Sequence, residues 1–485
     1  MMLEKLLVGV DCLELLNFKN LEVSTLAFDS RKVEQEGVFV ALTGTQVNGH
    51  DYIDVALAQG AVVIVCEVLP EVIPAEIVYV KVESSSKALS LMASNYYGNP
   101  SKDLKVVGIT GTNGKTTIAT QLFEVSRSLG FSSGLLSTVK VCIDEHEFPA
   151  THTTPDALQI NYYMREMVDA GASYCFMEVS SHGIDQNRIE GIDFTGAVFT
   201  NLSHDHLDYH KDFKSYRDVK KRLFDGLSKS AFSLVNKDDK NGVFMLQNSN
   251  SKKRFYGLKS VSDYHGKVIE NGLFGLHLKI NNHELYTKML GLFNAYNLLA
   301  IYGVGMELGW SEEDLLRALS LLQGADGRFQ CTVSQTGVYV IVDYAHTPDA
   351  LKNVLETISD FKGNGKVISV FGCGGDRDRS KRPIMARIGV GMSDYAVLTS
   401  DNPRTEDPNE ILAEMERGVA SEDVSKYIVI PDRKQGIKLA CQQASSGDVL
   451  LIAGKGHETY QEIGKQRFDF DDNLVVSELL TELKK

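Results

Sequence analysis

The chain has 485 residues, of which 43% are hydrophobic and 24% charged, and its formal net charge is −14. This length predicts roughly two to four domains, and an acidic chain without a basic stripe argues against a nucleic-acid partner. Seven scattered cysteines without a C-x-x-C pair, and no apolar run near the about 20 residues of a membrane span, predict a soluble cytoplasmic protein, with a monomer as the default expectation.

The first region, residues 1–103, begins with MMLEKLLVGVDCLELL, an apolar segment broken by charges. This pattern predicts a first amphipathic helix rather than a signal peptide. Short strands follow at 38–44 and 61–66, and a helix is expected near 86–97.

A glycine-rich turn between a strand and a helix opens the second region, in VVGITGTNGKTTIATQL (106–122). Gly111 and Gly114 let backbone N–H groups approach phosphate oxygens, and the helix starting near Lys115 presents its positive end. Lys115 can reach the β- and γ-phosphates, and the Thr116 hydroxyl can bind Mg²⁺. These features predict a nucleoside triphosphate site. An ordinary Gly/Asn turn is the alternative, and Ile109 departs from the common pattern, which has glycine there.

The remainder alternates between apolar strands and helices. The second region is expected to hold strands at 174–180 and 196–202, helices at 214–227, 294–306 and 311–322, and a peripheral β-rich stretch at 236–290. The third region restarts at 338–358 and continues through strands within 366–376, 394–403, 426–432 and 448–456. This rhythm predicts parallel sheets covered on both faces, with ligands at the carboxyl ends of the strands.

Polar side chains follow two strands of the second region. Glu178 stands at the end of one and can bind the same Mg²⁺, the alternative being an exposed carboxylate. In NLSHDHLDYH, the spacing of His204, His206 and His210 does not match a structural zinc pattern. We therefore interpret His206 as a neighbour of a metal or phosphate.

The helix SYRDVKKRLFDGL predicts an inward face of Val219, Leu223 and Phe224. By pattern alone, Lys220 and Lys221 are solvated surface charges.

Several side chains outside the phosphate loop are candidates for nucleotide contacts. Asn294 and Asn297 could approach the adenine or the ribose. Arg328, Asp343 and His346 could face the triphosphate from the third region, and a distant arginine commonly stabilises transition-state charge.

Three loops of the third region carry candidate substrate contacts. GDRDRSKR is an anion-binding candidate through Arg377, Arg379, Lys381 and Arg382. Arg404 follows a rigid proline in DNPR and suits a fork-like grip on a carboxylate. Glu458 in KGHE is a possible partner for an ammonium group. For Arg404 and Glu458 the alternative is plain surface charge.

Taken together, these motifs resemble the Mur ligases. GTNGKTT, the Thr153-Thr154-Pro155 triplet, EVSSHG, NLSHDHLDYH, NAYN, GRFQ, DYAHTPDAL, GCGGDRDRSKRP, DNPR and GKGHE occur in that family's order over nearly the whole chain. The family uses the same altered phosphate loop, so Ile109 is no objection. DNPR with GKGHE is specific to the tripeptide-forming member of the family, and members with arginine in this loop resemble the meso-diaminopimelate users.

The resemblance implies an α/β protein of three domains: a UDP-binding domain (1–103), a central P-loop ATPase domain (104–332) and a C-terminal Rossmann-like domain for the amino acid (333–485). It implies ATP-dependent addition of meso-2,6-diaminopimelate to UDP-MurNAc-L-Ala-D-Glu through an acyl phosphate, in peptidoglycan precursor synthesis. The same ligation with L-lysine, a folylpolyglutamate-synthase-like ligase and a nucleotide-switched binding protein are the alternatives.

The resemblance also assigns residues. ATP would be bound by Gly111, Thr112, Asn113, Gly114, Lys115, Thr116, Thr117, Asn294, Arg328, Asp343 and His346. The UDP-MurNAc-dipeptide would contact Ser30, Thr45, Gln46, Val47, His152, Thr153, Thr154, Ser180, Gln186 and Arg188. The amino acid would meet Arg377, Asp401, Asn402, Pro403, Arg404, Gly454 and Glu458. The implied catalytic residues are Lys115, Glu178, His206 and Lys220, and Mg²⁺ would be held by Thr116, Glu178, His206 and a CO₂-derived carbamate on Lys220.

Arg404 favours diaminopimelate over lysine. Diaminopimelate has a second carboxylate for this arginine to grip, and lysine lacks it. A buried Arg404 left unpaired against lysine would cost several kcal/mol.

Overall fold

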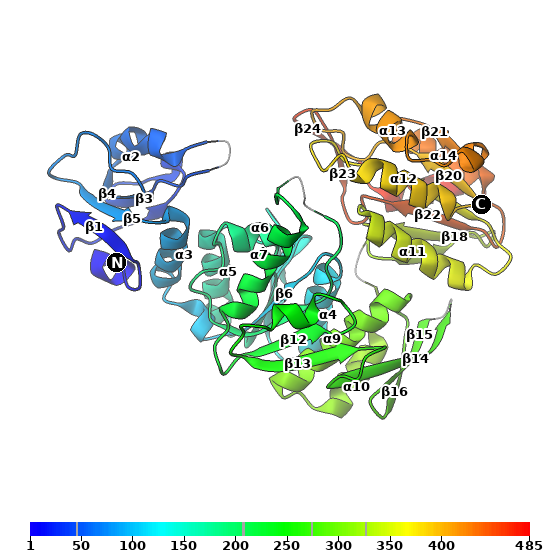
Figure 1. Cartoon of the computed structure of the whole chain (residues 1–485), viewed down its shortest axis with the longest axis horizontal. Helices are drawn as coiled ribbons and strands as arrows, with labels where there is room; N and C mark the ends of the chain where they lie inside the picture. The colour runs from blue at the N-terminus through cyan, green and yellow to red at the C-terminus, as the bar shows by residue number, and fades with distance from the viewer. Residues whose placement is uncertain (45–46, 206–208, 273–274, 325–326) are drawn as a thin grey trace.

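The computed structural model describes every residue except 45–46, 206–208, 273–274 and 325–326. It shows three α/β units arranged one after another, with the N-terminal unit at one end and the C-terminal unit at the other (Figure 1). No helix within the described part of the chain is long and apolar enough to cross a membrane.

The N-terminal unit is built on a five-stranded sheet. Its elements are α1 (Leu3–Leu6), β1 (Cys12–Leu16), β2 (Leu26–Ala27), η1 (Ser30–Lys32), β3 (Gly37–Val40), η2 (Gly49–Tyr52), α2 (Ile53–Gln59), β4 (Ala61–Cys66), β5 (Val78–Val82), α3 (Ser85–Tyr96) and η3 (Pro100–Lys102). The strand order is β1-β5-β4-β3-β2, and β1 alone is antiparallel to its neighbour. The expected first amphipathic helix is wrong beyond Leu6, because the segment turns at Gly9 and continues as the edge strand β1.

The central unit surrounds an eleven-stranded sheet. Its elements are β6 (Lys105–Thr110), α4 (Lys115–Ser128), β7 (Ser133–Leu136), β8 (Lys140–Ile143), β9 (His146–Pro149), α5 (Ala157–Asp169), β10 (Tyr174–Glu178), α6 (Ser181–Asp185), β11 (Phe194–Phe199), α7 (Phe213–Asp225), β12 (Phe232–Asn236), α8 (Gly242–Met245), β13 (Lys252–Gly257), β14 (Tyr264–Gly272), β15 (Gly275–Ile280), β16 (His283–Thr287), α9 (Leu292–Leu308) and α10 (Glu312–Leu321). Strand β6 lies between β10 and β11, so the loops after these three parallel strands meet at one edge.

The polar stretch 236–290 is β-rich as expected, but part of it extends the main sheet. Strands β12, β13 and β14 pair in parallel, and β14, β15 and β16 then form an antiparallel edge.

The C-terminal unit holds a six-stranded sheet and a separate hairpin. Its elements are β17 (Gln330–Val333), β18 (Tyr339–Asp343), α11 (Pro348–Phe361), β19 (Val367–Phe371), α12 (Lys381–Gly391), β20 (Tyr395–Leu398), α13 (Pro408–Glu416), η4 (Ser421–Lys426), β21 (Tyr427–Val429), α14 (Arg433–Gln443), β22 (Val449–Ala453), β23 (Tyr460–Ile463), β24 (Gln466–Asp469) and α15 (Asp472–Glu482). The order β17-β18-β22-β19-β20-β21 places β22 between β18 and β19. Because β17 pairs with β18, this sheet begins slightly before the expected domain limit at 332/333.

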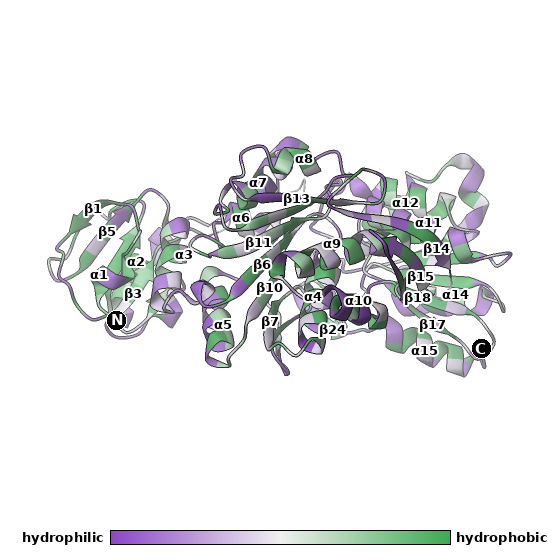
Figure 2. Ribbon diagram, turned by 90° about the horizontal axis from the view of Figure 1, so that it is seen from below, coloured by the Kyte–Doolittle hydropathy of each residue, from purple (hydrophilic) through white to green (hydrophobic). Residues whose placement is uncertain are grey.

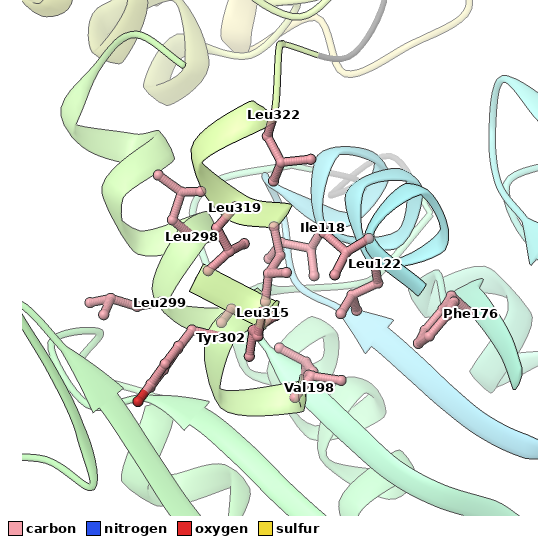
Figure 3. Packing of buried hydrophobic residues seen from close by; sticks show 14 of the residues in the cluster. Ile118, Leu122, Phe176, Val198, Leu298, Leu299, Tyr302, Leu315, Leu319 and Leu322 are labelled. Atoms are coloured by element: carbon pink, nitrogen blue, oxygen red, sulfur yellow. The ribbon is translucent and has the colours of Figure 1, made fainter. Parts of the chain in front are cut away.

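Apolar side chains from helices and strands bury the face of the central sheet that α4, α9 and α10 cover. Ile118 and Leu122 of α4 lie one turn apart and point toward Leu298 of α9 and Leu315 of α10 (Figure 3). Strands at the middle of the sheets are mainly hydrophobic, whereas α7 and α10 carry many hydrophilic residues (Figure 2). This packing fixes the start of α4, and with it the phosphate loop.

Candidate active site

The loop between β6 and α4 requires glycine at two positions. Gly111 and Gly114 have φ angles of +150° and +88°. A Cβ atom on Gly111 would lie 1.9 Å from Thr200 Oγ1, and one on Gly114 would lie 2.7 Å from Asn297 Oδ1. The loop has no room for side chains there, so a phosphate can approach its backbone closely at the start of α4. The N–H groups of Thr112 and Asn113 donate to Asn201, at 2.9 and 3.0 Å, so the first turn of α4 is the part of the loop that can donate to a phosphate.

We expect Gly111→Ala to weaken ATP binding by about tenfold, a loss of about 1.4 kcal/mol. The new methyl group would displace Thr200, whose hydroxyl donates to the Asn113 carbonyl at 2.6 Å. Gly130→Ala is the matched control, because Gly130 also has a positive φ, of +87°, but nothing lies within 4 Å of its added Cβ. Calorimetric titration with ATP and thermal unfolding would check both proteins. An equal loss of ATP affinity in the two variants would contradict a steric role for Gly111.

Two lysine side chains converge on one carbonyl oxygen of this loop. Lys115 Nζ donates to Gly111 O at 2.9 Å and to Thr112 O at 2.8 Å, and Lys220 Nζ donates to Gly111 O at 3.0 Å. Burial lowers the pKa of Lys115, while Glu178 and Asp205 act in the opposite direction. Lys115 thus lies where part of its charge would be balanced by bound phosphate.

Lys220 is the more deeply buried of the two, with 1% of its surface exposed. Burial first, and the positive charge of Lys115 second, place the pKa of Lys220 well below its ordinary value of 10.5. Both effects disfavour the ammonium form of Lys220 relative to that of a lysine in water.

The prediction from pattern alone that Lys220 and Lys221 are solvated is wrong. Both are buried on α7, and they point to different surroundings. Lys221 forms an ion pair with Asp225 at 2.5 Å, whereas Lys220 reaches across to the phosphate loop. Tyr216, one turn before Lys220, is completely buried and fixes this register.

Two oxygen-bearing side chains meet beside the loop. Thr116 Oγ1 donates to Glu178 Oε2 at 3.0 Å, and Glu178 Oε1 accepts from the Thr138 backbone N–H at 2.8 Å. The parallel pairing of β10 with β6 sets Glu178 opposite Ile109, one residue before the end of β6. Hydroxyl and carboxylate oxygens are the donors that Mg²⁺ prefers, so this pair fits the expected metal.

Thr116 and Glu178 are only two of the ligands expected for the metal ion. Among the described residues, no group of three or more histidine, cysteine, aspartate or glutamate side chains is arranged to hold a metal ion. His206 lies outside the described residues.

Arg328 connects the C-terminal unit to the phosphate loop. Its Nη2 donates to Thr116 Oγ1 at 3.2 Å, and its guanidinium lies 4.4 Å from the centre of the Tyr344 ring. Asp343 accepts hydrogen bonds from the backbone N–H groups of Phe329, at 2.6 Å, and Ala345, at 2.7 Å. Asp343 therefore holds the segment that carries Arg328, and its own contact with ATP stays a prediction.

Asn294 and His346 also lie in this neighbourhood. Asn294 is buried and accepts from Asn297 Nδ2 at 2.9 Å. His346 Nδ1 lies 2.8 Å from Tyr344 O, and burial, followed by the charge of Lys381, lowers the pKa of His346 to about 4. Its imidazole is neutral at physiological pH, and its contact with ATP remains a prediction.

Two side-chain contacts between the units were not expected from the sequence. Asn113 Nδ2 donates to Asp349 Oδ2 at 3.0 Å, and His204 Nε2 lies 2.9 Å from Asp378 Oδ2. No local pattern identifies such pairs, because the partners are more than 170 residues apart.

The residues expected to hold the muramoyl-dipeptide lie together beside Glu178. Thr154 Oγ1 donates to Glu178 O at 2.8 Å and accepts from Ser180 N at 2.9 Å. Arg188 donates to Thr154 O and to Gln186 Oε1, both at 2.6 Å. Two further members join them: Thr153, which accepts from Thr138 Oγ1, and His152, whose pKa is lowered by burial and by Arg188.

The UDP end belongs to the N-terminal unit at one end of the molecule (Figure 1). Ser30 begins η1 and is buried, whereas Val47 is exposed. Thr45 and Gln46 lie outside the described residues. This unit meets the central one where Asn187 Nδ2 donates to Ser86 Oγ at 2.9 Å.

The loops expected to bind the amino acid meet at the carboxyl ends of β19, β20 and β22. Arg404 has a φ angle of +51°, and it donates through Nε to Glu462 Oε2 at 3.1 Å and through Nη1 to Gly375 O at 2.8 Å. Asn402 Nδ2 donates to Glu458 Oε2 at 2.8 Å. Gly454 must be glycine, because a Cβ there would lie 2.4 Å from Asp401 Oδ2.

The basic loop GDRDRSKR supplies fewer anion-binding groups than its sequence indicates. Arg382 is completely buried between Glu406 and Glu414, and Arg379 also pairs with Glu414. Lys381 donates to the His346 carbonyl at 3.0 Å. Arg377 and Arg379 are both exposed, but Arg377 makes no ion pair with the residues that the structure describes and donates to the Asp376 carbonyl at 3.0 Å.

Comparison with known proteins agrees with this arrangement. Three family models match: "Mur ligase family, catalytic domain" at residues 22–97, "Mur ligase middle domain" at 109–305 and "Mur ligase, glutamate ligase domain" at 327–456. A protein of Cytophaga hutchinsonii named UDP-N-acetylmuramoyl-L-alanyl-D-glutamate–2,6-diaminopimelate ligase is 48% identical over 486 residues, with all of both chains covered. This chain belongs to the Mur ligase family.

Solved structures support the three-unit architecture of this Mur ligase. A structure titled as a UDP-N-acetylmuramoyl-L-alanyl-D-glutamate–2,6-diaminopimelate ligase has a TM-score of 0.68 and 34% identity, covering 96% of each chain. A folylpolyglutamate synthase from Thermotoga maritima has a TM-score of 0.59 and 14% identity, and it covers 76% of this chain and 90% of its own. The second likeness concerns the fold alone.

Proposed function

We propose that this Mur ligase joins meso-2,6-diaminopimelate to the D-glutamate γ-carboxylate of UDP-MurNAc-L-Ala-D-Glu with hydrolysis of ATP to ADP and phosphate. This is a cytoplasmic step of peptidoglycan precursor synthesis. The observation that carries the proposal is Arg328, which donates to Thr116 of the phosphate loop while its guanidinium lies over Tyr344, just after a strand of the third sheet. The 48% identity with a ligase of that name, over both full lengths, supports the choice of substrates.

The reaction needs two transfers at one site. A γ-carboxylate oxygen of D-glutamate attacks the γ-phosphorus of ATP, the bond to the bridging oxygen breaks, and ADP leaves. The amine of diaminopimelate then attacks the acyl-phosphate carbonyl, loses a proton and forms the amide as phosphate departs. Lys115 and Arg328 face the region where negative charge accumulates, which is where fixed positive groups accelerate such steps most.

Bound Mg²⁺ would supply further positive charge to offset the repulsion between the anionic reactants. Thr116, Glu178, His206 and a carbamylated Lys220 would hold it. The neutral Lys220 amine that burial favours can add to CO₂ and release one proton, which converts the side chain into a carboxylate-like ligand.

Two alternatives use the same loops. Ligation of L-lysine would leave Arg404 without a substrate carboxylate. A folate-type ligase would leave the N-terminal unit, which the 22–97 family match covers, without a role.

Phosphate release with ATP, Mg²⁺ and UDP-MurNAc-L-Ala-D-Glu tests the proposal when meso-diaminopimelate or L-lysine is added in parallel. We expect turnover with diaminopimelate and a tripeptide product by mass spectrometry. Turnover with lysine instead would retain the ligase and overturn the substrate assignment. No turnover with either amino acid would favour the folate-type ligase, or a nucleotide-switched binding protein if slow ATP hydrolysis were independent of substrate.

A further inference from the structure

A buried lysine joins two loops of the amino-acid site. Lys455 follows Gly454 at the end of β22, and its side chain has 0% exposure. Its Nζ donates to Asn402 Oδ1 at 3.0 Å and to Glu458 Oε2 at 3.1 Å. Asn402 donates to the same oxygen of Glu458. A buried ammonium in such a place is stable only when these acceptors are kept.

Two cations act on the carboxylates of this region in different ways. Asp401 and Glu458 both feel the charge of Lys455. The charge of Arg433 also acts on both carboxylates, but its own hydrogen bonds go to Asp472, and both of those side chains have 0% exposure. Lys455 is therefore the buried cation that holds Glu458 by a direct hydrogen bond.

The second carboxylate oxygen of Glu458 is not the one that accepts from Lys455 and Asn402. Its Oε1 lies 3.5 Å from the Tyr344 hydroxyl, and the side chain keeps 14% of its surface exposed. This oxygen can accept a further hydrogen bond from an ammonium group, while Arg404, paired with Glu462 on the neighbouring loop, is a donor for a carboxylate.

We propose that Lys455 is a positioning residue, which holds Glu458 and Asn402 in the arrangement that receives the ammonium group of the incoming amino acid. Lys455 does not contact the substrate itself. This inference rests on the proposed ligase function and adds a residue that sets amino-acid affinity through its neighbours.

The charges around Glu458 make the role of Lys455 measurable through the pKa of Glu458. Burial and Asp401 raise the pKa of Glu458, and Lys455 opposes this rise. Removing Lys455 would raise the pKa of Glu458 further, so its carboxylate would be lost at a higher pH. The charged and titratable groups that act on Glu458 are Asp401, Lys455, Arg433, Tyr344 and Tyr460.

The test compares Lys455→Met and Lys455→Arg in the full chain with Lys465→Met, a control at an exposed lysine of the nearby hairpin. We expect Lys455→Met to raise KM for meso-diaminopimelate by about tenfold or more and to leave KM for ATP unchanged. The acidic limb of kcat/KM for diaminopimelate should also move to higher pH. Lys455→Arg, which keeps the charge, should recover part of the affinity, and Lys465→Met should match the wild type.

The outcomes separate this role from the proposed function. Wild-type turnover with an unchanged KM for diaminopimelate in Lys455→Met would overturn the positioning role alone, as would equal changes in KM for ATP and for diaminopimelate without a pH shift. A wild-type enzyme inactive with every amino acid would overturn the proposed function, and this inference with it. If thermal unfolding shows that Lys455→Met does not fold, Lys455→Gln tests the charge of Lys455 alone, because its amide can still donate to Asn402 and Glu458. The acidic limb of kcat/KM for diaminopimelate should then move to higher pH, and an unmoved limb would overturn the positioning role.

Discussion

Lys220→Met is expected to reduce ligase turnover by about 100- to 1,000-fold, the range seen when one preorganised charge-stabilising group is removed from an active site. Lys220 is buried, and its amine reaches the carbonyl of Gly111 in the phosphate loop. Methionine has nearly the same length and suits a buried position, so the loss would come from the missing amine and its carbamate. Steady-state phosphate release and thermal unfolding together measure the effect.

Lys221→Met is the matched control for this variant. Lys221 is adjacent and also buried, but its ion pair with Asp225 lies away from the phosphate loop. Its loss is expected to lower stability more than turnover. A Lys220→Met enzyme with wild-type turnover would exclude a catalytic role for Lys220.

The carbamate itself can be tested through its dependence on CO₂ and pH. Because the pKa of Lys220 is lowered by burial and by Lys115, its amine stays neutral until the pH falls through that lowered value. Below it the ammonium form prevails and cannot add to CO₂. Activity in CO₂-depleted buffer should therefore fall, be restored by added bicarbonate as a source of CO₂, and need a higher concentration of dissolved CO₂ as the pH decreases. A ¹³C signal from labelled bicarbonate that is absent in Lys220→Met would assign the site.

Arg404→Ala is expected to raise KM for meso-diaminopimelate by about 10- to 100-fold, since a hydrogen bond to a charged group is worth about 1.5–3 kcal/mol. KM for ATP should be unchanged, because Arg404 contacts Glu462 and Gly375 and lies on the third sheet's loops. The substrate carboxylate would compete with Glu462 for the guanidinium. Initial rates at varied diaminopimelate and varied ATP separate the two effects.

Arg417→Ala provides a matched arginine deletion at an exposed position just after α13. It should leave both KM values unchanged. An equal KM for diaminopimelate in Arg404→Ala and wild type would refute the carboxylate-binding role, and with it the main argument against lysine.

The local sequence and the tertiary structure gave different answers about the burial of Lys220. The helical period identified α7 and its inward apolar positions, but it assigned both lysines to solvent. Burial of Lys220 depends on the Gly111 carbonyl, 109 residues earlier in the chain. Only the resemblance of the surrounding motif indicated its role in advance, because a family motif retains information on distant partners that a local period lacks.

Lys455 shows the same limit. GKGHE was recognised as a motif, and its Glu458 was assigned, but a lysine between two glycines after a strand looks like an exposed loop charge. Its acceptors Asn402 and Glu458 belong to different loops, which meet because β22 and β20 both flank β19 in the sheet. A lysine directly after a continuous buried strand was the one available signal.

The sequence by itself determined the alternation of strands and helices, the phosphate loop with Lys115 and Thr116, and the family. These follow from local periodicity, glycine sterics and motif order, all of which can be read directly from the order of residues in the sequence. Only the tertiary structure showed that Lys220 is buried beside Lys115 and that Arg382 forms ion pairs with Glu406 and Glu414. It also showed that Lys455 joins two substrate loops. Charge state and burial depend on groups distant in sequence, and the packing of strands and helices brings these groups together.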